Sequence, residues 1–300
     1  MISIVISTYR PRYLNKLKQN IDLTIGVEYE IIAIDNTGAR MGLCELYNMG
    51  AKRAKYDIVC FMHEDIDIKT NNWGSKVIDI FSKHAHLGLL GVAGSGYKPA
   101  MPSGWFFPWI NKRSLYINTL QRLNDTNKVD RTILNPNNEV LSKVVAVDGF
   151  WLCTKKDITL EIPFDQLTFK SFHCYDIDFS LSVYQKYDVA VTYEILIEHF
   201  SEGNFDTGWL IETIKLHKKW IDYLPINLVR FNSLDQVLTE EGAFYFILPL
   251  LNKDFALYKD VYELLWSRSV RSLLPLKSFL KLNFLLSTGF MKKMVAVNKK

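Results

Sequence analysis

The first two thirds of this 300-residue sequence alternate between short apolar runs rich in β-branched residues and stretches of helical periodicity. Strands are predicted over Ser3–Ser7, Glu30–Ile34, Ile58–Met62, Leu87–Ala93, Val144–Cys153 and Val189–His199, and helices over Leu43–Ala54, Trp73–Ser82 and Asp176–Lys186. Nearly continuous apolar strands separated by helices are typical of a largely parallel sheet that is covered on both faces. The alternation therefore predicts an α/β fold.

The pattern changes twice along the chain. Residues 95–143 are dominated by glycine, proline, asparagine and aromatic residues, and we expect a long loop there, which in a compact domain is usually functional or mobile. From Phe205 onward the periodicity is helical, without strand signals. We therefore expect an α/β domain over residues 1–204, followed by a helical C-terminal region over residues 205–300 that faces an acceptor or a membrane.

The composition is that of a globular enzyme. Hydrophobic residues make up 48% and charged residues 23%, and because the net charge is only +4, no general nucleic-acid-binding surface is expected. After Glu263 no acidic residue occurs, whereas eight basic residues do: Arg268, Arg271, Lys277, Lys281, Lys292, Lys293, Lys299 and Lys300. The longest apolar run, Ala243–Leu251, is much shorter than the ~20 residues of a membrane-spanning helix. The chain is expected to be soluble or to lie on a surface.

The four cysteines are widely separated along the chain and form no Cys-x-x-Cys pair, which argues against a zinc site. They are Cys44, Cys60, Cys153 and Cys174. The sequence opens directly into the apolar run Ile2–Ile6, without the basic region of a secretory signal. We therefore expect reduced thiols and a cytoplasmic location.

Polar residues follow the first three predicted strands, where an open parallel sheet binds its ligands. They are Ser7–Tyr9, Asp35 with Asn36, and His63–Asp67. The sequence has no glycine-rich phosphate-binding motif, so a bound diphosphate needs another source of positive charge. The acidic residues of 64–67 are suited to Mg²⁺ or Mn²⁺, which complete their coordination with phosphate oxygens. A simple turn at Asp35 and a solvated acidic loop at 64–67 are the alternatives.

Several segments, in this order, resemble motifs of the family 2 glycosyltransferases of the GT-A fold. They are Ile4–Tyr9, Ile34–Asn36, Phe61–Asp65, Val147–Leu152, Phe172–Leu181 and Ile197–Ser201, so the resemblance covers roughly residues 1–203. It implies a Rossmann-like GT-A fold with a mixed, mostly parallel sheet and a small helical C-terminal region. The nucleotide-sugar and metal sites would then lie within residues 1–204.

The resemblance also implies a reaction, namely the inverting transfer of a sugar from a nucleotide diphosphate to an acceptor hydroxyl, assisted by Mn²⁺ or Mg²⁺. Asp65 would contact the metal and the diphosphate, with His63, Asp67 and His199 as further metal ligands. Asp176 would be the catalytic base; its rival, Asp178, lies ~200° away around a helix and cannot face the same sugar. The donor would be held by Ser7, Thr8, Tyr9, Asp35, Asn36, Glu64, Asp65 and Gly149.

Two positions depart from the family's pattern. His63 replaces the first carboxylate of the Asp-x-Asp motif, while a literal Asp-x-Asp follows two residues later at Asp65 and Asp67. Tyr175 stands where the family often has Glu beside the base. His63 and His199 could instead be structural histidines, and a non-catalytic nucleotide-sugar-binding relative is an alternative function. A sugar nucleotidyltransferase is a weaker alternative because no glycine- and lysine-rich loop follows the first strand.

The acceptor side and the tail leave further alternatives open. Trp105, Trp109 and Tyr175 could contact an acceptor sugar, or the two tryptophans could simply pin down their own loop. Apolar residues of the tail alternate with Lys277 and Lys281, which suits a helix lying on anionic lipid or a packed helix with its lysines in water. The expected partners are a UDP-sugar and a saccharide or lipid-linked acceptor, without nucleic acid. The expected setting is bacterial polysaccharide or glycolipid assembly at the inner face of the membrane.

Overall fold

The structure of the protein is a computed structural model that describes residues 1–38, 41–122, 129–201, 203, 205–251, 254 and 256–297, with side chains up to residue 291. The chain divides into two compact units. Unit 1 comprises Met1–Ser95 and Leu115–Gly203, and unit 2 comprises Gly96–Ser114 and Asn204–Lys300. The second junction lies beside the boundary expected at residue 204, but the sequence did not indicate that residues 96–114 belong with the C-terminal region.

The centre of unit 1 is a seven-stranded sheet. Its strands, in spatial order, are β10 (Leu141–Val144), β13 (Asp188–Thr192), β5 (Leu87–Gly91), β12 (Trp151–Lys155), β3 (Ile58–Met62), β1 (Ile2–Thr8) and β2 (Tyr29–Asp35). Strand β1 is parallel to β2 and β3, and β5 is parallel to β13. Strand β12 is antiparallel to both of its neighbours, and β10 is antiparallel to β13. The sheet is therefore mixed, as expected. Of its two antiparallel strands, β10 is at the edge and β12 is in the middle.

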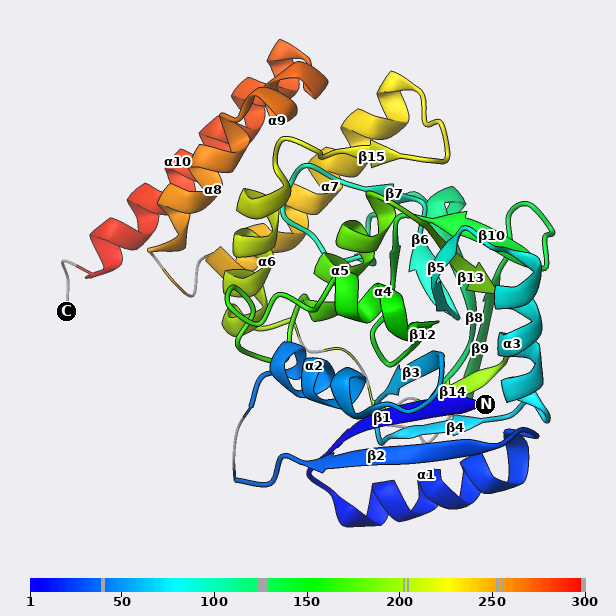
Figure 1. Ribbon diagram of the computed structural model, residues 1–300. Helices are drawn as coiled ribbons and strands as arrows, with labels where there is room; N and C mark the ends of the chain where they lie inside the picture. The colour runs from blue at the N-terminus through cyan, green and yellow to red at the C-terminus, as the bar shows by residue number, and fades with distance from the viewer. Residues whose placement is uncertain are drawn as a thin grey trace. The chain divides into compact units, whose positions relative to one another are not determined.

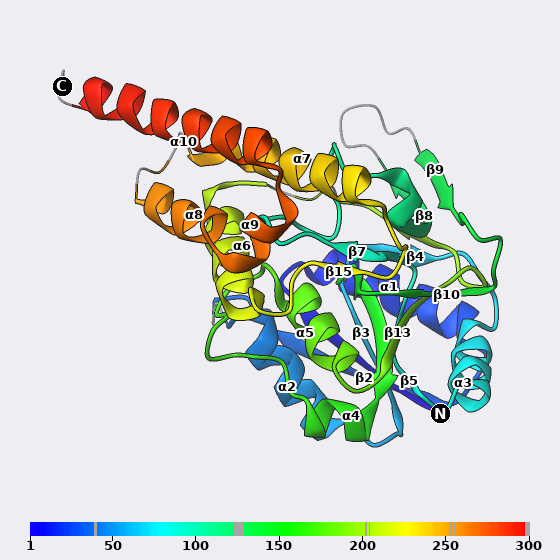
Figure 2. The same cartoon turned by 90° about the horizontal axis from the view of Figure 1, so that it is seen from above.

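Helices cover both faces of this sheet. They are α1 (Pro11–Thr24), α2 (Leu43–Arg53), α3 (Trp73–Lys83), α4 (Lys156–Glu161) and α5 (Tyr175–Tyr184). Successive side chains of a strand point to opposite faces. Phe61 of β3 accordingly packs on Tyr47 of α2, whereas Trp151, which is paired with the next residue of β3, packs on Trp73 of α3. Figures 1 and 2 show α2 and α5 on one side of the strands and α3 on the other.

A second sheet of unit 1 corrects the prediction of a long loop over residues 95–143. Its strands are β11 (Ala146–Val147), β6 (Ala93–Ser95), β8 (Leu115–Arg122), β14 (Ile197–His199) and β4 (Ile66–Ile68), and β9 (Val129–Leu134) pairs with β8. Strand β8 bonds to β6, β9 and β14, and β14 lies some eighty residues further along the chain. Local periodicity does not report such pairing, so the segment reads as a loop in the sequence.

Two of the four cysteines are not the reduced thiols that we predicted. Cys60 of β3 and Cys153 of β12 are directly opposite each other in the register of these strands, and they form a disulfide with a Cα–Cα distance of 4.1 Å. They are 93 residues apart in sequence, so no local spacing could reveal the pair. Cys44 and Cys174 are buried and form no disulfide.

Unit 2 is helical. It contains α6 (Thr207–Trp220), α7 (Ser233–Leu251), α8 (Leu257–Leu265), α9 (Arg268–Leu273) and α10 (Leu276–Val297), a short 3₁₀ turn over Lys112–Ser114, and the paired strands β7 (Tyr97–Lys98) and β15 (Ile226–Asn227). Among the described residues, no helix is both long enough and apolar enough to cross a bilayer.

Buried charges hold residues 96–114 against the helices of unit 2. The carboxylate of Glu240 in α7 accepts hydrogen bonds from the Tyr97 hydroxyl and from the amides of Ala100 and Met101. The Lys98 ammonium, which is fully buried, donates to Ser103 and lies 2.8 Å from Nε2 of His217 in α6. Because a buried charge is tolerated only with such partners, these bonds explain why the segment belongs to unit 2.

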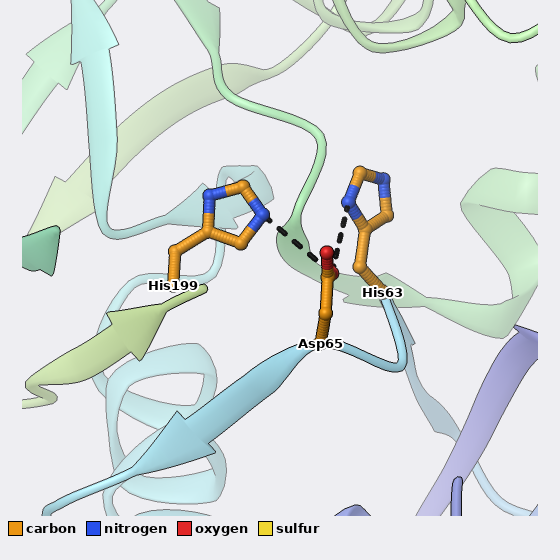
Figure 3. A group of neighbouring side chains, drawn as sticks. All are labelled: His63, Asp65 and His199. Carbon is orange, nitrogen blue, oxygen red and sulfur yellow. Dashed lines mark ion pairs between the residues drawn. The ribbon is translucent and has the colours of Figure 1, made fainter. Parts of the chain in front are cut away.

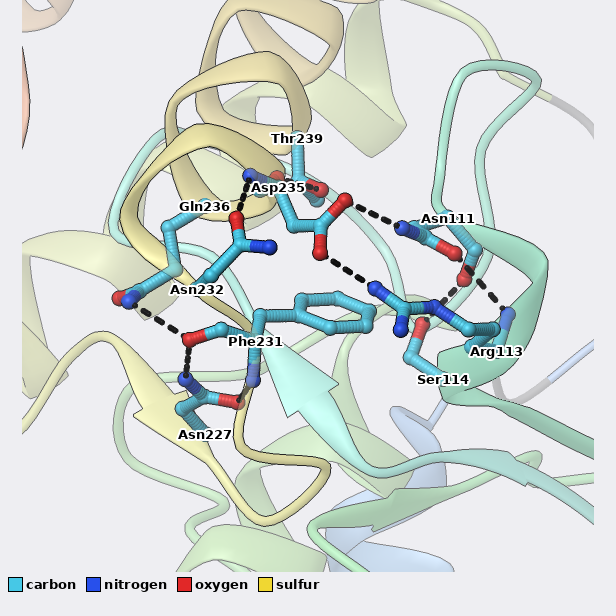
Figure 4. A network of polar contacts seen from close by, with 9 residues as sticks. All are labelled: Asn111, Arg113, Ser114, Asn227, Phe231, Asn232, Asp235, Gln236 and Thr239. Carbon is cyan, nitrogen blue, oxygen red and sulfur yellow. Dashed lines mark hydrogen bonds and ion pairs between the residues drawn. The ribbon is translucent and has the colours of Figure 1, made fainter.

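A polar network fixes the start of α7 (Figure 4). Asn232 caps the helix, because its Oδ1 accepts a hydrogen bond of 2.9 Å from the amide of Asp235. The Asp235 carboxylate binds the guanidinium of Arg113, whose Cζ lies 5.2 Å from the ring centre of Phe231. The 3₁₀ turn of Arg113 and the first turn of α7 are thereby joined.

Close packing of α2 on β1 gives a test of this fold. Gly50 faces Val5, and a Cβ atom built on Gly50 would lie 2.2 Å from a methyl carbon of that fully buried valine. We expect Gly50→Ala to cost about 1–3 kcal/mol of unfolding free energy by overpacking, which exceeds the gain of up to ~1 kcal/mol in helix propensity. Urea unfolding measures the change. Lys52→Ala, at an exposed position of the same helix, should stay within about 0.5 kcal/mol; a Gly50→Ala variant of equal stability would contradict this packing.

Candidate active site

Three potential metal ligands of unit 1 come together from three segments (Figure 3). His63 follows β3, Asp65 immediately precedes β4, and His199 ends β14. Oδ1 of Asp65 lies 3.9 Å from Nδ1 of His63 and 3.6 Å from Nε2 of His199. The antiparallel pairing of β14 with β4, in which His199 is opposite Ile66, places the histidine beside Asp65.

The donor atoms of this cluster fit a divalent metal ion. All three lie within 4.8 Å of one another. Two ligands that are each about 2.1 Å from one ion are at most about 4.2 Å apart, so small side-chain rotations suffice to bring all three into contact. One carboxylate and two imidazoles suit a transition-metal ion better than Mg²⁺, which prefers oxygen ligands.

The protonation states also suit a cation. Burial and the neighbouring His199 lower the pKa of His63 to about 4, so its imidazole is neutral at pH 7 and carries a free lone pair. Burial by itself would raise the pKa of Asp65, but the hydrogen bond of His199 and electrostatic interactions with His63 and His199 outweigh it and hold that pKa well below the usual range. Asp65 is therefore ionised.

Tyr175 bonds to the ring nitrogen of His63 that is not directed toward Asp65. Its hydroxyl lies 2.7 Å from Nε2 of His63, which leaves Nδ1 directed toward Asp65. Burial keeps the pKa of Tyr175 well above its ordinary value, so the hydroxyl is protonated. The two positions that depart from the family's pattern are thus bonded to each other. On the other face of the cluster, the ring of Phe150 stacks on His199 at 4.7 Å.

Gly149 packs against the first turn of α5, where a side chain would not fit. A Cβ atom at this position would lie 2.1 Å from the Tyr175 hydroxyl oxygen and 2.9 Å from Cβ of Asp176. The amide of Gly149 donates a hydrogen bond of 3.1 Å to Oδ2 of Asp176. Only glycine lets the first turn of α5 approach the backbone so closely, and this approach positions both Tyr175 and Asp176.

Asp176 has the electrostatics of a base that works near neutral pH. Burial, and secondly the charge of Asp148, raise the pKa of Asp176 to about 7. A base is most effective when its pKa is close to the working pH. Asp148 thus supplies the second carboxylate near the base, although Tyr175 occupies the position where the family often has Glu.

The family follows from comparison with known proteins. A model described as "Glycosyltransferase like family" matches residues 5–220, well over half of the chain. The protein belongs to this family. It is a family 2-like glycosyltransferase with a mixed α/β fold of the GT-A type, as the motifs predicted. The sequence matches none of the curated proteins.

Solved structures agree with this fold. The glycosyltransferase is similar to residues 1–349 of TarS from S. aureus in complex with UDP, with 12% identity and a TM-score of 0.62. The complex of the same TarS fragment with UDP-GlcNAc gives 12% identity and a TM-score of 0.61. Each comparison covers 97% of this chain and 88% of the other. At such low identity the likeness shows the fold alone.

Two acidic residues of the glycosyltransferase that were predicted to bind metal or donor are bonded to other groups of the protein. Asp67 is not part of the metal-ligand cluster: its Oδ1 accepts a hydrogen bond from Asn20, and its Oδ2 lies 3.0 Å from Nζ of Lys69. Glu64 is buried and accepts hydrogen bonds from the Thr8 hydroxyl and from the amides of Tyr9 and Arg10. Its carboxylate, like the Thr8 hydroxyl, is therefore engaged in holding the end of β1.

The other predicted donor residues lie at the ends of β1 and β2. The amide of Asn36 bonds to the carbonyl of Thr8, so these two strand ends lie side by side. The Asn36 side chain is engaged with the backbone of Met41 on both its amide atoms. Asp35 and Tyr9 are exposed, and Ser7 is half-buried. A hydrogen bond from the amide of Thr37 lowers the pKa of Asp35, so this carboxylate is ionised and accessible to a ligand.

The rival base is more buried than Asp176, and the predicted acceptor-side tryptophans belong to unit 2. Asp178 is 2% exposed, whereas Asp176, two residues earlier, is half-buried. Trp105 and Trp109 belong to unit 2, where Trp109 is 56% exposed and Phe107 is fully buried. Phe107 therefore fixes the loop, while the Trp109 ring is available for contacts.

Three residues near the site were not singled out from the sequence. Asp148 raises the pKa of the base, Phe150 stacks on His199, and the Ser201 hydroxyl lies 3.1 Å from Nε2 of His199. Asp148 and Phe150 lie within the segment Val147–Leu152, and Ser201 lies within Ile197–Ser201, so each belongs to a recognised motif. Their position in a motif was the only signal, because the contacts themselves are tertiary.

The coupling of Asp148 to Asp176 gives a prediction. Removal of a like charge lowers the pKa of a carboxyl group, so Asp148→Asn should move the titration of Asp176 from about 7 to lower pH. The ¹³C resonance of the Asp176 carboxyl group, followed against pH without added metal, reports the midpoint. Asp22→Asn, at an exposed position of α1, is the charge-matched control. An unchanged midpoint in Asp148→Asn would rule out this coupling.

Proposed function

We propose that this glycosyltransferase moves a sugar from a nucleotide-diphosphate donor to an acceptor hydroxyl with inversion, in one displacement assisted by a divalent metal. The observation that carries the proposal is that the metal-ligand cluster and the raised-pKa carboxylate share one location. Tyr175 bonds to His63 of the cluster, and Asp176 is the next residue in the chain. Both Asp65 and Asp176 act electrostatically on the same buried residue, Tyr47.

The chain's own residues have separate roles in this proposal. Asp176 accepts the proton of the acceptor hydroxyl as that oxygen attacks the anomeric carbon, which requires hydrogen-bond distance between the two. His63, Asp65 and His199 hold the metal, which when bound offsets the charge of the departing diphosphate. The exposed ends of β1 and β2, with Asp35 and Tyr9, contact the nucleoside. The side chains of Thr8, Asn36 and Glu64 support these strand ends.

We propose a UDP-sugar as the donor. The TarS fragment to which the chain is similar in fold was solved with UDP and with UDP-GlcNAc. A saccharide or lipid-linked saccharide is proposed as the acceptor, in bacterial polysaccharide or glycolipid assembly. A panel of UDP-, GDP- and dTDP-sugars, assayed for transfer and for hydrolysis with and without Mn²⁺, tests the donor. Binding without turnover of any sugar would identify a non-catalytic relative instead.

A cytoplasmic location at the inner face of a membrane completes the proposal. Cys44 and Cys174, which form no disulfide, fit a reducing compartment, whereas a disulfide such as Cys60–Cys153 is more common in oxidising ones. Fractionation of cells that express the protein, with the thiols blocked at lysis, decides both the compartment and the oxidation state in which the protein occurs.

The role of Asp176 can be tested by a nearly isosteric change. Asp176→Asn should lower kcat by at least ~10²-fold, because it removes the base, and should leave donor affinity nearly unchanged. In the wild type, the base form is lost as pH falls, so kcat/KM should decrease below a midpoint of about 7, or lower once a nearby cation favours the ionised form. Calorimetric titration with the donor and pH–rate profiles measure these effects.

The stability of the same variant separates loss of chemistry from loss of fold. A carboxyl group whose pKa is raised by folding stabilises the fold at low pH and loses that contribution as pH rises through about 7. At pH 8 Asp176→Asn should therefore have a Tm equal to or above that of the wild type. Full transfer activity in this variant would show that another group is the base.

The metal-ligand cluster depends, in this proposal, on the hydrogen bond between Tyr175 and His63. A metal-bound histidine usually donates its other ring N–H to a fixed partner, and loss of that partner weakens binding about 10–100-fold. Here Nε2–H of His63 would donate to the Tyr175 oxygen, which leaves Nδ1 as the ligand. Tyr175→Phe should therefore weaken Mn²⁺ binding at least ~10-fold.

Manganese EPR measures this affinity directly, without an activity assay. Tyr184→Phe, at the other end of the same helix, removes a hydroxyl away from His63 and should bind Mn²⁺ like the wild type. Mg²⁺ should compete only weakly with Mn²⁺, because two of the three ligands are imidazoles. Equal Mn²⁺ affinity of Tyr175→Phe and the wild type would show that Tyr175 does not position a ligand.

A further inference from the structure

Helix α10 has two apolar faces, and only one of them is packed. On the packed face, Phe279, Leu282 and Leu286 are at most 8% exposed, and the helix lies beside α8 in Figure 1. On the other face, four large apolar side chains lie in water: Leu276 is 72%, Leu280 57%, Phe284 68% and Met291 57% exposed. Packing within unit 2 therefore leaves part of the apolar surface of this helix exposed.

The exposed side chains line one side of the helix. At about 100° per residue, the four positions fall within an arc of about 80°, and at about 1.5 Å per residue they extend over about 22 Å of helix. We call these four residues the α10 stripe. Its length runs along the helix axis, so a binding partner would contact the side of the helix rather than its end.

Positive charge borders the α10 stripe. Lys277 is exposed and lies about 20° beyond the edge of this arc. Lys281 follows one turn later, where its Nζ is 3.2 Å from Glu241 and 5.1 Å from the ring centre of Tyr245, both in α7. The sequence contains no acidic residue after Glu263, so α10 has no carboxylate of its own. Lys292, Lys293, Lys299 and Lys300, which we expected to add to this charge, lie outside the described side chains.

The apolar surface continues onto α7. Leu234 and Leu238 are 67% and 56% exposed, and they precede Glu241 by seven and three residues. Residues at this spacing share a helix face, so both leucines lie on the face of α7 that meets Lys281 of α10. At the end of α8, Trp266 is 43% exposed, and its ring N–H donates a hydrogen bond of 2.7 Å to Asn283 of α10. A half-exposed tryptophan with a bonded polar tip is typical of a membrane–water interface.

We infer that the α10 stripe lies in the headgroup region of a bilayer that contains anionic lipids. A helix with leucine and phenylalanine along one side, bordered by lysine and lacking acidic residues, binds such surfaces by apolar burial together with charge attraction. A second copy of the chain is the alternative occupant. It is disfavoured because the stripe offers no carboxylate to the Lys277 side chain of a partner, whereas anionic headgroups offer many phosphate groups. The inference does not depend on the proposed reaction.

Vesicle co-sedimentation with the full chain tests this inference. The wild type should sediment with phosphatidylcholine vesicles that contain phosphatidylglycerol, bind pure phosphatidylcholine at least ~10-fold more weakly, and be released by salt. The double variant Leu280→Asp/Phe284→Asp should lose at least ~10-fold in binding to the anionic vesicles. Its matched control is Leu23→Asp/Leu167→Asp, which places the same charges at two leucines of unit 1 that are each 81% exposed.

Three results would overturn the inference. They are absence of wild-type binding to either vesicle, equal binding by the stripe variant and the wild type, and equal loss of binding in the stripe variant and its control. Light scattering on the same samples adds a fourth, namely a wild-type dimer that becomes monomeric in the stripe variant, which would assign the stripe to a second copy. Circular dichroism of both variants shows that the helices are retained. None of these measurements requires transfer activity, so their failure is distinguishable from failure of the proposed reaction.

Discussion

The site of this glycosyltransferase depends on the close approach of helix α5 to the backbone at Gly149. Without a side chain at that position, the Tyr175 hydroxyl and the Asp176 carboxylate can occupy the space that a Cβ atom would fill. The same approach lets Tyr175 reach His63 at the end of β3, and the amide of His63 bonds to the carbonyl of Phe150. One backbone contact thus connects the base, the metal ligands and the central antiparallel strand.

The folded structure favours the protonated form of the proposed base. Burial and the like charge of Asp148 favour the protonated form of Asp176, so ionising it near neutral pH costs stability. Glu240 of unit 2 is a second buried acid whose pKa is raised by burial, and it accepts hydrogen bonds from Tyr97 and two backbone amides. Its bonds hold residues 96–114 against α7, whereas Asp176 lies next to Tyr175, which bonds to the metal-ligand cluster.

His63 and Tyr175, the two departures from the family's pattern, are explained together by the hydrogen bond between them. A histidine in place of the first motif carboxylate presents two ring nitrogens, and one of them needs a partner when the other faces the cluster. Tyr175, in place of a glutamate, provides that partner at 2.7 Å. The second carboxylate that Tyr175 displaces from α5 has a counterpart in Asp148, at the end of a different strand. The same chemical requirements are therefore met by residues from other segments.

The sequence by itself determined the strand and helix alternation, the mixed α/β fold and the candidates His63, Asp65, Asp176 and His199, because periodicity and motif order are local properties. Only the tertiary structure decided which acids face the cluster. Asp67 turns to Asn20 and Glu64 to the end of β1, and both bonds link residues about fifty positions apart. The strands within 95–143, the Cys60–Cys153 disulfide and the exposed face of α10 were decided in the same way, since pairing and burial depend on distant segments that no local pattern records.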